Sequence, residues 1–130
     1  MPCMIIAIDI DDTITANPSF FSLLSKAVIR DGGKVIIISS RPNLSETIRL
    51  TGQQLKEYGM RYSKLILMEG PDVAKATCPH VELDWWEKYL WQKVDICQKE
   101  KVEIVFEDDE KVVALFKKFA PEIQVLRVIK

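Results

Sequence analysis

Five short apolar segments recur along the chain, separated by longer stretches of mixed character. Each segment is rich in Ile and Val, and most are nearly continuous rather than alternating between apolar and polar positions. Such runs are typical of strands that are buried on both faces of a parallel sheet. The pattern therefore predicts five buried strands, at Met4–Ile10, Lys34–Ser39, Lys64–Met68, Glu103–Phe106 and Gln124–Ile129.

The intervals between these strands carry helical patterns. Phe20–Arg30 repeats apolar residues at helical spacing and stops at Asp31-Gly32-Gly33, a typical helix end. Further helices are expected at Leu44–Tyr58, Lys93–Lys99 and Lys111–Phe119. Alternating strands and helices predict the α/β class, as a three-layer α/β/α sandwich with a five-stranded parallel sheet of Rossmann-like type. The length fits one domain, over residues 1–130.

The interval from residue 69 to residue 92 is the least regular part of the chain. It holds all three tryptophans, Trp85, Trp86 and Trp91. Helical spacing would place one set of apolar residues on a common face, namely Leu83, Trp86, Leu90 and Val94. Trp85 and Tyr89 would then lie on another face. Two interpretations stay open: core packing with one exposed aromatic edge, or a flap that faces a substrate or a second subunit.

Composition and charge narrow the class of protein. With 18 basic and 19 acidic residues the net charge is −1, so nucleic acid is not indicated as a partner, although a local patch could still bind it. The three cysteines are few and far apart, which favours a reducing compartment, and Cys78 with His80 cannot complete a zinc shell. Acidic residues interrupt the first apolar run early. We therefore expect neither a signal peptide nor a membrane span, and a cytoplasmic protein.

Three carboxylates follow the first predicted strand directly, at Asp9, Asp11 and Asp12. In an open α/β sheet, ligands bind in the crevice beyond the carboxyl ends of the strands. Strand alternation places Asp9 and Asp11 on the same side, where both can point toward that crevice. One carboxylate could bind a cation and attack phosphorus, forming an aspartyl phosphate, while the other moves a proton.

The second and fourth strands also end in residues suited to phosphate or metal binding. Ser39 and Arg41 end the second strand with a hydroxyl and a guanidinium group, which can bind phosphate oxygens. The fourth strand ends in Glu107-Asp108-Asp109, and these acids would repel those of the first strand unless a cation lay between them. An all-oxygen shell with open positions favours Mg²⁺. Lys93 could add a fixed positive charge, although an isolated lysine is usually a solvated surface residue.

These strand-end residues give the chain a resemblance to the haloacid dehalogenase superfamily of phosphohydrolases, over essentially its whole length. The segment DIDDTI, from Asp9 to Ile14, matches the first motif of that family, D-x-D-x-[TV]-[LVI]. By this resemblance Asp9 is the nucleophile and a Mg²⁺ ligand. Asp11 is the general acid/base, and its backbone carbonyl also binds the metal. Thr13 supports the loop, and Asp12 and Thr13 are expected near the substrate phosphate.

The remaining motifs of the family follow in the expected order. Ser39 matches the second motif, a Ser or Thr that hydrogen-bonds the phosphoryl oxygens. Arg41-Pro42 is similar to the T-x-R-P form common in the family, so Ser40 and Arg41 are also expected beside the phosphate. The third motif is only a lysine. Lys93 fits it best, with Lys88 as a competitor.

The fourth motif is acidic, and Glu107-Asp108 matches its E-D type. The resemblance implies that Asp108 is the direct metal ligand and that Glu107 lies beside it or acts through water, with Asp109 as the fallback. Residues 15–33 and 69–92 are too short for a separate cap domain. The chain therefore resembles the capless branch of the family, whose open sites accept bulky substrates or borrow a neighbouring subunit as a lid.

The resemblance implies a Mg²⁺-dependent phosphatase that hydrolyses a phosphomonoester, carried by a small molecule or a polymer end. Three alternatives remain. A response-regulator receiver domain would need an Asp after the third strand, where Met68-Glu69-Gly70 stands, and a lysine after the fifth, where Lys130 is the last residue. The other two are a non-catalytic binding or scaffold module with the same fold and a phosphotransferase of the same superfamily.

Overall fold

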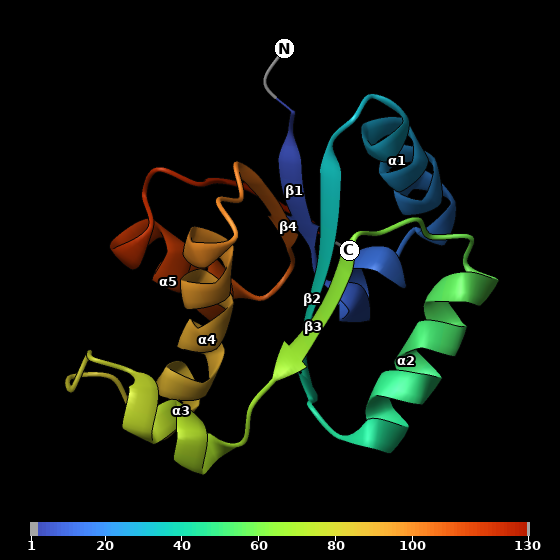
Figure 1. Ribbon diagram of the computed structural model, residues 1–130. Helices are drawn as coiled ribbons and strands as arrows, with labels where there is room; N and C mark the ends of the chain where they lie inside the picture. Colours follow the sequence, from blue (N-terminus) through green and yellow to red (C-terminus); the bar gives the residue numbers. More distant parts are fainter. Residues whose placement is uncertain (1–2, 130) are drawn as a thin grey trace.

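The computed structural model describes residues 3–129 (Figure 1). Its five strands form one parallel sheet, in the order β3-β2-β1-β4-β5. The strands are β1 Ile5–Ile8, β2 Lys34–Pro42, β3 Lys64–Met68, β4 Ile104–Glu107 and β5 Gln124–Arg127. The predicted α/β class and parallel sheet are confirmed, and the predicted strands agree with the observed ones to within a few residues.

Helices cover both faces of the sheet, which gives three layers (Figure 1). The helices are α1 Pro18–Arg30, α2 Ser45–Glu57, α3 Pro71–Thr77, α4 Trp85–Lys99 and α5 Glu110–Phe119. Alternate strand residues enter two separate cores: Ile6 and Ile8 pack with Phe21 of α1, whereas Ala7 packs with Val94 of α4. Both faces of the sheet are therefore buried, as the continuous apolar runs predict.

The predicted end of the first helix is confirmed. Helix α1 stops at Arg30, Asp31 caps it, and Gly32 follows with a positive φ of 86°. Helix α4 differs from the prediction, because it begins at Trp85 rather than at Lys93. Asp84 and Glu87 form a reciprocal capping box at its start, which stabilises this earlier beginning. Lys93 consequently lies inside α4, not before it.

The tryptophan-rich segment is partly as expected. Trp85 is 66% exposed and Trp86 is 37% exposed, whereas Leu90 is buried. The expectation for Tyr89 is wrong, because Tyr89 is buried rather than on the outer face with Trp85. Its hydroxyl donates to the backbone oxygen of Ser40 at 2.6 Å, which satisfies the one polar atom of the ring and allows burial.

The strand order distinguishes this fold from one alternative. Receiver domains have the order 2-1-3-4-5, whereas this sheet has the order of a Rossmann-like fold. The receiver alternative is therefore wrong, and Lys130, on which it also depended, lies outside the described residues.

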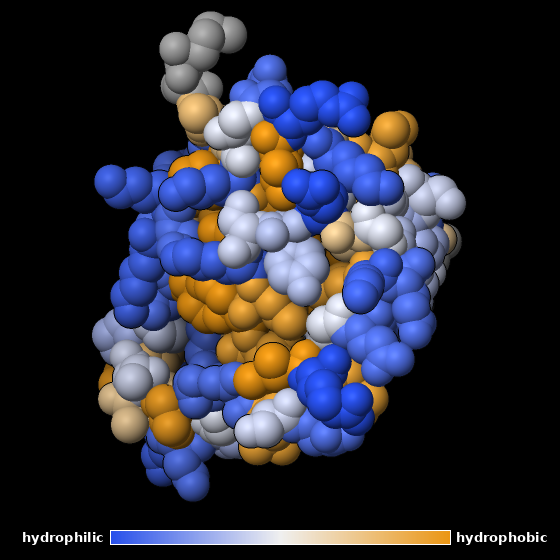
Figure 2. All heavy atoms as spheres, turned by 45° about the vertical axis from the view of Figure 1, so that its right-hand side comes forward, coloured by the Kyte–Doolittle hydropathy of each residue, from blue (hydrophilic) through white to orange (hydrophobic). Residues whose placement is uncertain are grey.

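Within residues 3–129, no helix is both long and apolar enough to cross a membrane. Seen from the side of α1 and α2, the surface of the protein has a central apolar area with polar side chains around it (Figure 2).

Candidate active site

A tight turn after β1 places Asp9 at the carboxyl end of the sheet. Asp9 continues the extended backbone, and its N–H donates to the backbone oxygen of Phe106 in β4 at 3.1 Å. The chain then turns through Ile10–Ile14, where Asp12 has a φ of 62°, a conformation that Asp tolerates better than most residues. Ile10 and Ile14 are fully buried and anchor the turn, so the Asp9 carboxyl group is held in a fixed place.

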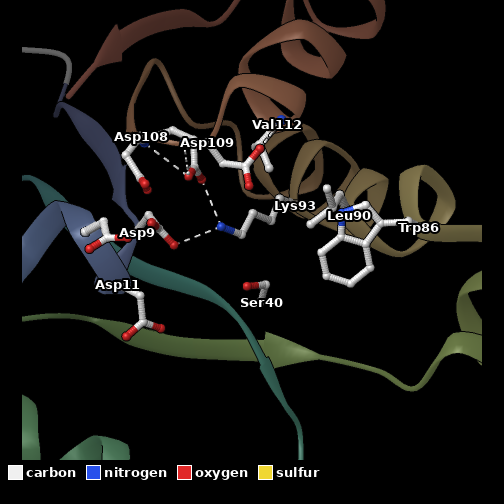
Figure 3. A pocket seen from close by; sticks show the side chains of 11 residues that line it. Asp9, Asp11, Ser40, Trp86, Leu90, Lys93, Asp108, Asp109 and Val112 are labelled. Carbon is white, nitrogen blue, oxygen red and sulfur yellow. Dashed lines mark hydrogen bonds and ion pairs between the residues drawn. The ribbon is translucent and has the colours of Figure 1, made fainter. Parts of the chain in front are cut away.

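Lys93 connects the acids of the first and fourth strands. Its ammonium group lies 2.8 Å from Oδ1 of Asp9 and 2.8 Å from Oε2 of Glu107 (Figure 3). All three side chains are at most 6% exposed. The helix α4 supplies the lysine and the strand ends supply the carboxyl groups. Two buried carboxyl groups thus share one ammonium group, and when both are ionised one negative charge is left uncompensated.

Burial shifts the pKa values of these groups. Burial raises the pKa of Asp9 from 3.8 to about 8, Lys93 opposes the rise, and the neighbouring Glu107 adds to it. Burial likewise raises the pKa of Glu107, against the attraction of Lys93. For Lys93 burial acts against the ammonium form, but the two carboxylates outweigh it and raise its pKa above the usual value. The site therefore favours an additional positive charge.

Asp108 completes a cluster of three acids with Asp9 and Glu107. One carboxylate oxygen from each lies within 4.8 Å of the others. The Thr13 hydroxyl lies 3.2 Å from Oδ2 of Asp9 and 3.2 Å from Oδ1 of Asp108, yet it has only one hydrogen to donate. A cluster of carboxylate oxygens with an excess of negative charge is the donor set that hard divalent cations prefer. The residues present therefore fit Mg²⁺.

Glu107 and Asp109 are already engaged by the protein itself. Glu107 accepts from Lys93 with one oxygen and from the N–H groups of Asp108 and Asp109 with the other, each at 3.2 Å. Asp109 caps α5 by accepting from the N–H groups of Lys111 and Val112. Among the acids of the fourth strand, Asp108 thus has the carboxylate best placed to bind a metal together with Asp9.

Asp11 forms an ion pair with Arg41. The guanidinium group donates to both carboxylate oxygens, at 2.8 and 3.0 Å, and its remaining nitrogen donates to Thr51 of α2 at 3.0 Å. This hydrogen bonding lowers the pKa of Asp11, against a smaller opposing effect of burial. Asp11 lines the same pocket as Asp9, but the turn Ile10–Ile14 places it there rather than the predicted strand alternation, because β1 ends at Ile8. Arg41 holds it in place in the ionised form.

The two serines at the end of β2 lie in different surroundings. Ser39 is fully buried, and its hydroxyl accepts from the N–H of Arg41 at 3.1 Å. Ser40 lines the pocket, whereas Ser39 is not among the described residues that do so. The pairing of β2 with β3 is irregular between Ile38 and Pro42, in the segment that carries both serines.

The pocket enclosed by these residues has a volume of about 140 Å³. Its polar wall comes from the turn after β1 and from the end of β4, and its apolar wall comes from Trp86, Leu90 and Val112 (Figure 3). Helical spacing predicted Trp86 on one face with Leu90, and both line this pocket, but Trp86 is 37% exposed rather than part of the core. Of the two lysines considered, Lys93 reaches this pocket, whereas Lys88 does not line it.

Comparisons with known proteins give a fold but no family. No protein-family model and no curated protein sequence matches the chain. A chain of the Pnkp1/Rnl/Hen1 complex is similar in structure, with a TM-score of 0.66 and 18% sequence identity, over 97% of this chain and 46% of that chain. A chain of the Pnkp1/Rnl/Hen1 RNA repair complex is similar to the same degree, over 96% of this chain and 42% of that chain.

A universal stress protein in complex with cAMP is also similar, with a TM-score of 0.53 and 12% identity, over 97% of this chain and 96% of that chain. At such low identities the likeness shows the fold alone. The chain spans less than half the length of the two chains from the RNA repair complex.

We expect the metal-free protein to lose stability as the pH rises from about 4 to about 8. The pKa of Asp9 is about 8 in the folded state and 3.8 ordinarily. Protonation of Asp9 therefore stabilises the fold fully below about pH 4, and this stabilisation is lost as the pH rises toward 8. Urea unfolding in EDTA should give a free energy of unfolding a few kcal/mol lower at pH 8 than at pH 5. Added Mg²⁺ should restore stability at pH 8.

The Asp9→Asn variant provides the control for this measurement, because it removes the titrating group. Its metal-free stability should change less between pH 5 and pH 8 than that of the unmodified protein. An equal pH dependence in both proteins would show that the effect does not come from Asp9.

Proposed function

We propose that the protein is a Mg²⁺-dependent phosphohydrolase of the haloacid dehalogenase type, which cleaves a phosphomonoester through an aspartyl phosphate. The observation that carries this proposal is the meeting of Asp9, Lys93 and Asp108 around one small pocket at the carboxyl ends of β1 and β4. Asp9 and Lys93 are 84 residues apart in the chain, so only the fold brings them together. This edge of an open α/β sheet is where ligands bind in such folds.

Asp9 is the proposed nucleophile. Its carboxylate oxygen forms a bond to phosphorus while the bond from phosphorus to the leaving oxygen breaks, and the leaving oxygen takes up a proton to become an alcohol. Lys93 offers its buried ammonium group to the phosphoryl oxygens on which negative charge develops. Asp9 and Asp108 would hold Mg²⁺, which when bound supplies positive charge that offsets the charge of the phosphate.

Asp11 is the proposed proton carrier. A general acid must hold a proton before it can give one, and Arg41 lowers the pKa of Asp11. The ionised carboxylate is therefore better suited to take a proton from the water that hydrolyses the aspartyl phosphate. Donating a proton to the leaving oxygen requires the pair with Arg41 to weaken when substrate binds.

An Asp11→Asn variant should retain the first chemical step and lose most of the second. With p-nitrophenyl phosphate, whose leaving group needs no proton, we expect a burst of about one nitrophenol per protein followed by turnover about 10² to 10⁴ times slower. The Asp11 side chain is 58% exposed, so the fold should stay intact. Rapid-mixing measurements of nitrophenol release test this, and unchanged steady-state turnover would remove Asp11 from the proposal.

The first experiment is phosphate release from p-nitrophenyl phosphate with Mg²⁺ and with EDTA. Activity that requires the metal supports the proposal, and binding without turnover would favour the non-catalytic alternative. Because two structural neighbours come from an RNA repair complex, phosphorylated RNA ends belong in the substrate screen beside phosphorylated metabolites. We also propose a cytoplasmic location, since Cys3, Cys78 and Cys97 are free thiols.

A further inference from the structure

The apolar wall of the pocket is built around Trp86. This residue lines the same pocket as Asp9 and Lys93, and it is 37% exposed. Its ring is stacked on that of Tyr89, with 5.4 Å between centroids and 6° between the ring planes. The Tyr89 hydroxyl is bound to the backbone of Ser40, so Trp86 rests on a ring that is fixed at both ends. Figure 3 shows the Trp86 indole on the side of the pocket away from Asp11.

The two walls of the pocket differ in chemistry. The charged wall at Asp9, Lys93 and Asp108 suits a phosphate group, so the rest of a phosphomonoester would extend toward the rim on the side of Trp86. Trp86 stands at that rim, where it leaves apolar aromatic surface in contact with water. Flat aromatic rings bind to such surfaces by stacking, and this binding tolerates differences in the ring.

The charges around the pocket limit the substrate further. Of the described residues that line the pocket, six are acidic and only Lys93 is basic. The acidic residues are Asp9, Asp11, Asp12, Glu107, Asp108 and Asp109. A divalent cation and Lys93 can offset one phosphate group, but additional phosphates at the rim would meet an excess of negative charge. This favours a substrate with a single phosphate over a polynucleotide chain.

We propose that Trp86 determines substrate specificity by stacking on a flat aromatic ring in the leaving group, and that the substrate class is a nucleoside monophosphate. The proposal rests on the phosphohydrolase function proposed above. A nucleobase supplies the ring and a mononucleotide supplies the single phosphate. The same base-plus-phosphate chemistry occurs at a phosphorylated polynucleotide end, which the charge of the rim disfavours.

The test compares substrates with and without a base. The protein with Mg²⁺ should hydrolyse adenosine monophosphate, tested as both the 3′ and the 5′ isomer, with a higher kcat/KM than ribose 5-phosphate. Trp86→Ala should lower the ratio of these two kcat/KM values by about tenfold to a hundredfold, mainly through KM for the nucleotide. Trp86→Phe should keep most of the ratio, because a phenyl ring still stacks.

Phe20→Ala is the control, because Phe20 is an aromatic residue of α1 that is 46% exposed and does not line the pocket, whereas the ring of Trp85 contacts that of Trp86 at 5.5 Å between centroids. Its ratio should stay within about twofold of that of the unmodified protein, since surface substitutions have small effects. An equal loss with both substrates in Trp86→Ala would reduce Trp86 to a structural role and overturn the inference. Faster hydrolysis of a 3′-phosphorylated oligonucleotide than of either mononucleotide would overturn the choice of a single-phosphate substrate.

A binding measurement separates this inference from the proposed function. Adenosine 3′- or 5′-monophosphate should quench the tryptophan fluorescence of the Asp9→Asn variant in the presence of Mg²⁺, and ribose 5-phosphate should not. Quenching without hydrolysis by the unmodified protein would retain the base-binding site and reject the phosphohydrolase. Hydrolysis of ribose 5-phosphate at the same rate, without quenching by the nucleotide, would retain the phosphohydrolase and reject the base-binding site.

Discussion

An Asp9→Asn variant is expected to release phosphate at least about a thousandfold more slowly than the unmodified protein, with every substrate. The amide cannot form the aspartyl phosphate. The substitution also replaces one of the two carboxylates best placed to bind Mg²⁺ with a neutral amide, whose oxygen can still contact the ion. Because Asn has almost the same volume as Asp and relieves the excess of buried negative charge, the variant should fold and be at least as stable as the unmodified protein at pH 8 without metal.

Asp31→Asn gives a matched control for this substitution. Asp31 follows α1, is exposed, and is not among the described residues that line the pocket of Asp9. Its change to Asn should leave phosphate release within about twofold. Steady-state assays of both variants, with circular dichroism to verify folding, make the comparison. Near-normal turnover in folded Asp9→Asn would exclude Asp9 as the nucleophile.

Lys93→Met is expected to cost about 3–5 kcal/mol of the free energy of unfolding at pH 8. The methionine fills a similar volume but leaves Asp9 and Glu107 buried beside each other without a compensating charge. Both carboxyl groups then have raised pKa values, so their protonation stabilises the fold below about pH 4 and this contribution is lost as the pH rises. The variant should therefore be relatively more stable in acid than at pH 8.

Lys88→Met is the control for Lys93→Met on the same helix. Lys88 is partly exposed, so its loss should change stability by no more than about 0.5 kcal/mol. Urea unfolding of both variants and of the unmodified protein, at pH 5 and pH 8, gives the change in the free energy of unfolding for each substitution. Equally small decreases in this free energy at pH 8 would mean that Asp9 and Glu107 do not depend on Lys93 for their charge balance.

The sheet could be predicted from the sequence because its strands are buried on both faces. Ile6 and Ile8 face one core and Ala7 the other, and this leaves an almost unbroken apolar run. The first residues of the helices were harder to predict than the strands. The sequence pattern does not predict the beginning of α4, although Asp84 and Glu87 carry a capping-box spacing, and it does not predict α3, although Pro71 at its first position is typical of a helix start.

The sequence places many of the acidic residues, Ser40 and Lys93 at the pocket, but the predicted Ser39, Thr13 and Arg41 are not among the described residues that line it, and the contacts could not be predicted. The acids after β1 and β4 stand at strand ends, so parallel strand pairing alone brings Asp9 and Asp108 to one edge. The pair of Asp11 with Arg41 depends on the shape of two turns, which the residue pattern does not specify. The place of Trp86 at the pocket depends on where α4 begins, and the capping box was the signal that could have located it.

The central claim is that Asp9 and Asp108 bind one divalent ion beside Lys93, and a crystal structure grown with Mn²⁺ and inorganic phosphate tests it most directly. Anomalous scattering locates Mn²⁺ without ambiguity. The account predicts one strong peak in contact with both carboxylates, with the phosphate between the ion and the Lys93 ammonium group. A peak elsewhere, or the two carboxylates turned away from a bound phosphate, would contradict it.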